Sequence, residues 1–275
     1  MKRIVILLLG ASLGLAGWWL WENPAQLHDI VGEYIDSSQI LTLEIKHPPE
    51  RVMEQRRKEL LPDTRYTFQE PVIKYYPYLL IEAKYAQEDH KTREGALLWS
   101  LIDGELVLDT LTWEKTEGFA DAIRAGANRA DFRVMYAVEK RGGSATREEL
   151  QKELRVETDT LVPWIQSALD KQLLVQSGNS YRLHLQNPKI LVAPESHIRQ
   201  EFVSKPLDRL DKVGRRYTRS QVEKVTYAAF GSSFAIRDVR EIFLPVVLIS
   251  VQNPDGTLHQ THWNALNGQK VAVLP

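Results

Sequence analysis

Apolar residues recur with helical spacing in the middle of the chain and then change to strict alternation. Phe132, Met135 and Tyr136 lie three and four residues apart, which predicts a helix with one buried stripe. Gly142-Gly143 would end this helix. Residues 174–185 alternate around a turn rich in serine and glycine, which predicts a β-hairpin.

Two further helices are expected between the first helix and the hairpin. Thr146 and Glu149 have the spacing of a capping box, which predicts a helix that runs to about Leu154. A third helix begins near Thr158 or Thr160. It tolerates a proline in its first turn, because the backbone amides there have no hydrogen-bond partner within the helix. Its expected buried residues are Val162, Ile165, Leu169 and Leu173.

The order of helix, helix, helix and hairpin from Asp131 to Leu185 resembles the winged-helix family. This resemblance covers about a fifth of the chain and implies a third helix of the kind that often lies in the DNA major groove. The third helix opens with Glu157 and Asp159, however, and acidic residues outnumber basic ones between Thr146 and Gln186. Phosphate contacts need cations, so we expect a protein-binding or structural module, with DNA binding as the alternative.

Each flank of this central segment predicts a helix followed by antiparallel strands. In the first flank, a strand at 40–45 precedes a helix that Pro48 opens and Pro62 ends. In the second flank, Thr218 and Gln221 form another capping box, and Gly231 ends the helix. The strands expected after the two helices are residues 64–68, 72–85, 95–110, 233–251, 258–266 and 269–273.

The two flanks also share short sequence patterns. Residues 76–81, Tyr-Pro-Tyr-Leu-Leu-Ile, parallel residues 244–249, Leu-Pro-Val-Val-Leu-Ile. Trp99-x3-Asp103-Gly104-x2-Val107 parallels Trp263-x3-Asn267-Gly268-x2-Val271. We interpret this as a duplicated helix-on-antiparallel-sheet domain. Each copy is similar in outline to the cystatin-like or PepSY-like family, and residues 267–271 resemble the end of a PepSY unit.

The N-terminal pattern predicts a membrane anchor. Lys2 and Arg3 precede an uncharged run from Ile4 to Trp21, which as a helix spans ~27 Å, about one hydrocarbon core. An uncleaved anchor is favoured over a signal peptide cleaved after Ala16, because cleavage would leave an exposed tryptophan-rich start. Under the positive-inside rule, the rest of the chain lies outside a bacterial-type inner membrane, in the periplasm.

Length and composition fit an α+β protein of several domains. The chain has 275 residues, of which 43% are hydrophobic and 26% charged, enough to bury a sizeable core. We expect a transmembrane helix and two helix-on-antiparallel-sheet domains that flank a central winged-helix domain. The absence of cysteine excludes disulfides and thiolate chemistry, and the net charge of −1 gives no attraction to nucleic acid. The expected boundaries are 1–24, 25–117, 118–188 and 189–275.

No pattern of catalytic, cofactor-binding or metal-binding residues is present. His259 and His262 are the closest pair of histidines, but three residues apart in a strand they face opposite sides of the sheet. There is no phosphate-binding glycine loop and no Gly-x-Ser-x-Gly elbow. We therefore expect no enzyme, no cofactor and no small-molecule ligand.

The expected function is protein binding or envelope assembly, with the membrane as one partner through Ile4 to Trp21 and other envelope proteins as further partners. Core packing is favoured over partner contact for most of the aromatic residues proposed as contacts. Trp113 and Phe119 are interpreted as buried anchors at a domain junction, with a partner-docking loop as the alternative. The proposed contact residues are Tyr75, Tyr76, Tyr78, Trp99, Trp113 and Trp263.

Two other function classes remain open. A membrane-tethered winged-helix transcriptional regulator would need the opposite membrane topology and a basic surface. A peptidase inhibitor, or an enzyme with a dispersed site, is the third class, and the cystatin-like outline is its only support.

Overall fold

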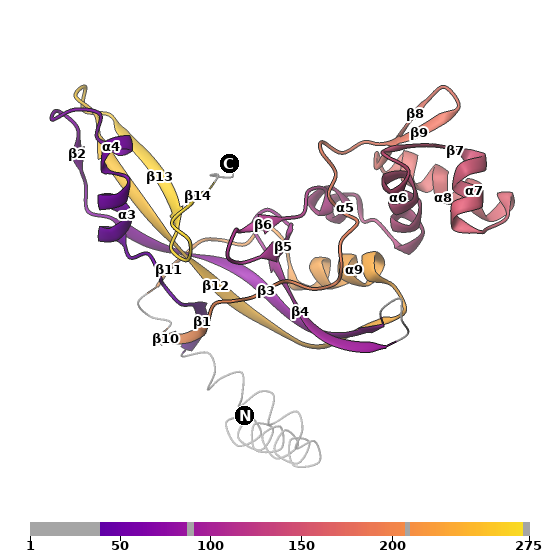
Figure 1. Ribbon diagram of the computed structural model, residues 1–275, viewed down its shortest axis with the longest axis horizontal. Coiled ribbons are helices and arrows are strands. Elements are labelled where there is room, and N and C mark those ends of the chain that lie inside the picture. The colour runs from indigo at the N-terminus through magenta and orange to yellow at the C-terminus, as the bar shows by residue number, and fades with distance from the viewer. Residues whose placement is uncertain (1–38, 87–90, 207–209, 272–275) are drawn as a thin grey trace, which may run out of the picture. The chain divides into compact units, whose positions relative to one another are not determined.

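Two long antiparallel strands, β3 (Val72–Ala86) and β12 (Phe234–Gln252), run side by side through the fold (Figure 1). The computed structural model describes residues 39–86, 91–206 and 210–271. The described part confirms the α+β class, with a curled mixed sheet of 11 strands, a small antiparallel sheet of 3 strands and seven helices.

The chain divides into two compact units. The larger comprises Leu41–Val203 and Asp211–Pro275, and the smaller comprises Met1–Ile40 and Ser204–Leu210. The predicted anchor, Ile4 to Trp21, lies outside the described residues. Within the described ranges, no helix combines the length and apolar character that a membrane crossing requires.

The first flank forms two short helices and six strands. Pro49 occupies the first turn of its helix, where the missing amide is harmless. The expected strand at 95–110 is two strands, because the chain reverses at Gly104, which has a φ of +78°. Besides β3, the elements are β1 (Gln39–Leu43), α3 (Pro49–Gln55), α4 (Arg57–Leu60), β2 (Thr67–Phe68), β4 (Thr92–Ser100), β5 (Leu106–Asp109) and β6 (Glu114–Lys115).

In its described residues, the second flank forms one helix and five strands. The Thr218–Gln221 capping box is confirmed, and the helix ends before Gly231 as predicted. The last predicted strand, 269–273, runs partly beyond the described residues. Besides β12, the elements are β10 (Phe202–Pro206), β11 (Asp211–Lys212), α9 (Arg219–Phe230), β13 (Leu258–Asn264) and β14 (Lys270–Val271).

The prediction of two separate flanking sheets is wrong, because the flanks share one sheet. β3 pairs along most of its length with residues 234–245 of β12, with Tyr76 opposite Leu244, and the central strand order is β1-β12-β3-β4-β5-β6. Residues 78–81 are buried in succession, and so are residues 242–249. A strand that is buried on both faces lies inside a sheet, with a paired strand along each edge. For β3 and β12, one of these paired strands comes from the other flank.

The segments that the sequence aligned occupy equivalent positions in this sheet. Leu79 lies opposite Trp99, and Val247 lies opposite Trp263. The strand pairings are symmetric about the Tyr76–Leu244 pair. Three further residue pairs of the sheet have an equivalent pair in the other flank. The pair Leu98 and Val107 corresponds to His262 and Val271, and the pair Leu41 and Ile242 corresponds to Asp211 and Lys74. The pair Phe68 and Val251 corresponds to Ile236 and Ala83.

The flank helices α3 and α9 each share a buried cluster with strands of the other flank, and α9 also packs on β12 of its own flank, where Tyr227 contacts Phe234. Val222 of α9 shares a buried cluster with Trp99, whereas Val52 of α3 shares one with Trp263. The backbone amides of residues 216 and 217 donate to the Leu101 carbonyl at 2.8 and 2.9 Å, and those of residues 46 and 47 donate to the Ala265 carbonyl at 2.9 and 2.7 Å. The exchange follows from β1 pairing with β12 and β11 with β3, which delivers each helix to the opposite end of the sheet.

The central segment forms four helices and a three-stranded sheet. The Thr146–Glu149 capping box is confirmed. The expected burial of Val162 is wrong: it is 42% exposed, because the apolar stripe of its helix runs through Leu161 and Ile165. The elements are α5 (Phe119–Ala125), α6 (Arg129–Lys140), β7 (Ser144–Thr146), α7 (Arg147–Leu154), α8 (Thr158–Asp170), β8 (Leu174–Ser177) and β9 (Ser180–Leu183), with strand order β7-β9-β8.

Phe119 joins the central segment to the large sheet. Its ring is fully buried and lies 5.0 Å from the Trp99 ring in an edge-to-face arrangement. The expected role of Phe119 as a buried anchor is therefore confirmed. The packing also crosses the boundary expected between residues 117 and 118.

Candidate binding site

The six aromatic residues proposed as partner contacts divide into two groups. Tyr75, Tyr78, Trp99 and Trp263 are at most 5% exposed and pack in the core, which rules out direct surface contact in this structure. Tyr76 and Trp113 are partly exposed, and their role as contacts stays a prediction.

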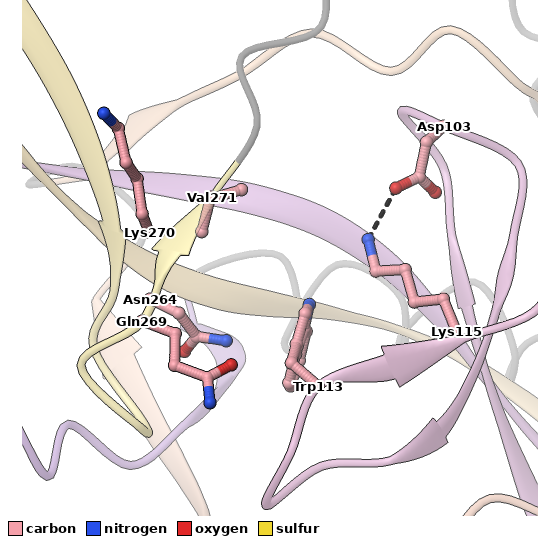
Figure 2. Close-up of a pocket in the computed structure, with 7 residues that line it drawn as sticks. All are labelled: Asp103, Trp113, Lys115, Asn264, Gln269, Lys270 and Val271. Carbon is pink, nitrogen blue, oxygen red and sulfur yellow. Dashed lines mark hydrogen bonds and ion pairs between the residues drawn. The ribbon is translucent and has the colours of Figure 1, made fainter.

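A cavity of about 260 Å³ lies beside Trp113. Figure 2 shows Trp113, Lys115 and Asp103 on one side of it, and a group from the end of β13 and from β14 on the other. The first side belongs to the first flank and the second side to the second flank. The residues of the second side are Asn264, Gln269, Lys270 and Val271.

The first side is held by an ion pair and a ring contact. The Lys115 ammonium lies 2.5 Å from the Asp103 carboxylate and 3.4 Å from the Tyr78 hydroxyl. Burial acts to lower the pKa of Lys115, but Tyr78 and Asp103 outweigh it and raise this pKa above the ordinary lysine value. The Trp113 ring meets the Tyr78 ring edge-on at 5.6 Å, and its backbone has a φ of +58°. The turn that carries Trp113 is therefore fixed by side-chain packing.

Asn264 organises the second side. It is 1% exposed, its Oδ1 accepts the Leu266 amide at 2.9 Å, and its backbone amide donates to the Gln269 carbonyl at 2.8 Å. Across the rim, the Asn267 side-chain amide donates to the Leu111 carbonyl at 3.2 Å. These bonds hold the backbone of the turn 264–269 in place.

Tyr76 and His262 adjoin this group on the same face of the sheet. Their rings are 6.5 Å apart, and burial, with Lys74 nearby, lowers the pKa of His262. His262 is therefore neutral at pH 7. Within the described ranges, no group of three or more histidine and carboxylate side chains is placed to hold a metal ion.

Several polar atoms around the cavity lack hydrogen-bond partners among the described residues. These atoms are Trp113 Nε1, Asn264 Nδ2 and His262 Nδ1, and all are shielded from bulk water. An unpaired buried donor costs about 1–3 kcal/mol relative to a paired one. The indole and amide nitrogens are donors only, and His262 Nδ1 accepts or donates according to the tautomer. The arrangement therefore favours a ligand rich in acceptors.

Sequence reasoning identified Trp113 but missed the residues that surround it. Lys115 and Asp103 are distant in sequence from Asn264 and Gln269, and only the curl of the shared sheet brings them together. The repeated Asp-Gly and Asn-Gly turns were the available signal, since Asp103 of the first turn and Gln269, next to the second, line the cavity.

The surface of α8 offers a second exposed region. Val162 and Pro163 are exposed in its first turns, Glu157 stands at the N-cap position without a side-chain capping bond, and Asp159 lies in its first turn. The helix carries no lysine or arginine. This surface is therefore unsuited to phosphate contacts.

Comparisons with protein-family models, with curated proteins and with solved structures gave no match. Function is therefore inferred from the residues and their geometry.

Proposed function

We propose that the chain is a membrane-anchored extracytoplasmic protein that acts by binding a partner protein at the cavity beside Trp113. The unpaired buried donors of Trp113 and Asn264 carry this proposal, since a partner that supplies acceptors would recover their desolvation cost. Tyr76 and Trp113 add partly exposed aromatic surface of the kind enriched in binding sites.

In this proposal, residues 118–188 form a winged helix that serves as a structural or protein-binding module. The order α6, α7, α8 followed by the β8–β9 hairpin supports the resemblance. The acidic start of α8 and its lack of cations favour a protein partner over DNA.

Site-specific photocrosslinking in intact membranes tests the proposal. With p-benzoylphenylalanine at Gln269, we expect a protein-sized adduct that decreases at least five-fold when Trp113→Ala is added. The matched control carries the same group at Tyr227, an exposed aromatic position on α9, and should give no such adduct. Equal amounts of adduct at both positions, or an amount at Gln269 that does not change with Trp113→Ala, would contradict binding at the cavity.

A further inference from the structure

The outer edge of β14 is the counterpart of an edge that is occupied in the first flank. There, β6 lies along the outer edge of β5: the Leu106 amide donates to Thr116 Oγ1, and the Thr116 amide donates to the Leu106 carbonyl, both at 2.9 Å. Lys270 takes the position of Leu106, because Trp263 pairs with Lys270 as Trp99 pairs with Leu106. The amide and carbonyl of Lys270 therefore point away from β13.

This counterpart edge has no strand on it in the described part of the chain. There, β14 pairs only with β13, whereas β5 pairs with both β4 and β6. The edge also borders the cavity, since Gln269, Lys270 and Val271 line it opposite Trp113 (Figure 2). An unpaired strand edge is a ready template for another strand.

We infer that an extended, acidic peptide segment of the partner protein pairs with β14, in the position that β6 takes on β5. The inference rests on the proposed function and specifies how the partner is held. Main-chain bonds to Lys270 supply the affinity, and the cavity beside Trp113 receives a side chain of the added strand.

The charges around the edge determine the acidic character of the segment. The Lys270 side chain is exposed and forms no ion pair with any described residue, whereas Lys115 already pairs with Asp103. The remaining polar groups toward the cavity include the Asn264 and Trp113 donors, which need acceptors. Because both nitrogens are shielded from water, each must rotate slightly toward the incoming carboxylate or carbonyl oxygens.

Peptide titration against the full chain in detergent tests strand addition. The probe is a fluorescent acetyl-(Val-Glu)4-amide peptide followed by anisotropy. Lys270→Pro removes the edge amide, at a position where a strand edge tolerates proline, and should weaken binding at least ten-fold. Lys270→Ala keeps the amide and should weaken it only about three-fold, close to the loss of one exposed charge pair. Lys224→Glu, an exposed charge change on α9, should leave binding unchanged.

A second probe keeps the test independent of the folding of any variant. The unmodified chain is titrated with the same peptide after methylation of alternate backbone nitrogens. This methylated peptide should bind at least ten-fold more weakly than the unmethylated one, and (Val-Lys)4 should not bind. Equal binding of the methylated peptide would overturn strand addition in favour of a simple carboxylate site, and no binding of the acidic peptide would also overturn it. A photocrosslinked partner at Gln269 that persists with Lys270→Pro would leave the proposed function standing and overturn this inference alone.

Discussion

At the scale of single residues, Trp99 and Trp263 have the same structural role in the two flanks. Each is buried at the equivalent position, belongs to a buried cluster that includes residues of a helix from the other flank, and lies opposite an apolar residue of a long strand. The repeated sequence pattern identified both tryptophans, but it could not identify which flank helix shares a buried cluster with each of them.

Trp99→Ala and Trp263→Ala should therefore destabilise the fold by similar amounts. Removing a buried aromatic side chain costs about 3–5 kcal/mol. Urea unfolding of the two variants measures the loss, with Trp164→Ala on the half-buried side of α8 as the control. A loss below about 1 kcal/mol for either core variant would contradict the equivalence.

Tyr85 provides a residue-scale test of alkaline stability. Burial and the Glu195 carboxylate, which accepts its hydroxyl at 2.8 Å, raise the pKa of Tyr85 to about 12. Folding favours the protonated form of Tyr85. The contribution of this group to fold stability is complete below about pH 10, the pKa of tyrosine in the unfolded chain, and is lost as the pH rises through 12. Tyr85→Phe should lose less stability than the unmodified chain between pH 10 and 12. Parallel urea midpoints over this range would contradict the assignment.

At the scale of secondary-structure elements, the exchanged helices depend on two glycine turns. A Cβ at Gly104 would lie 2.8 Å from the Tyr217 ring, and one at Gly268 would lie 3.0 Å from the His47 ring. Tyr217 and His47 each come directly before the N-cap residue of the helix that crosses to the other flank. The turns therefore help to position the helices.

Gly104→Ala and Gly268→Ala should each cost more than the same change at Gly178. All three glycines have positive φ, but nothing lies within 4 Å of a Cβ at Gly178. The control should lose about 1 kcal/mol from backbone strain alone, and the other two about 2–3 kcal/mol. Thermal unfolding measures the difference, and equal losses in all three would contradict close packing at the turns.

Local patterns predicted most elements because their signals are short-range. The capping boxes at Thr146 and Thr218 form hydrogen bonds with backbone amides only a few residues away. The glycines that end helices also act on the neighbouring backbone alone. The pairing of β3 with β12 and the exchange of the helices depend on contacts between residues far apart in the chain, as in Tyr78 opposite Ile242. Local periodicity carries no information about such partners, so the sequence predicted two sheets instead of one.

At the scale of the whole molecule, we infer that the two flanks arose by duplication of one unit. Equivalent pairings recur in strands, turns and helix starts, although few side chains are shared. The flanks differ at the outer edges of β5 and β14, where the first holds β6 and the counterpart borders the cavity. The candidate site follows from this difference, which no single stretch of sequence contains.

The extracytoplasmic position of the body is the claim on which the proposed function depends most. Lys2 and Arg3 before the apolar run from Ile4 to Trp21 are its basis. A C-terminal fusion to alkaline phosphatase, paired with a C-terminal fluorescent-protein fusion that matures only in the cytoplasm, measures it directly. We predict high phosphatase activity and no fluorescence. Bright fluorescence with an inactive phosphatase would place the body in the cytoplasm and contradict the proposed topology.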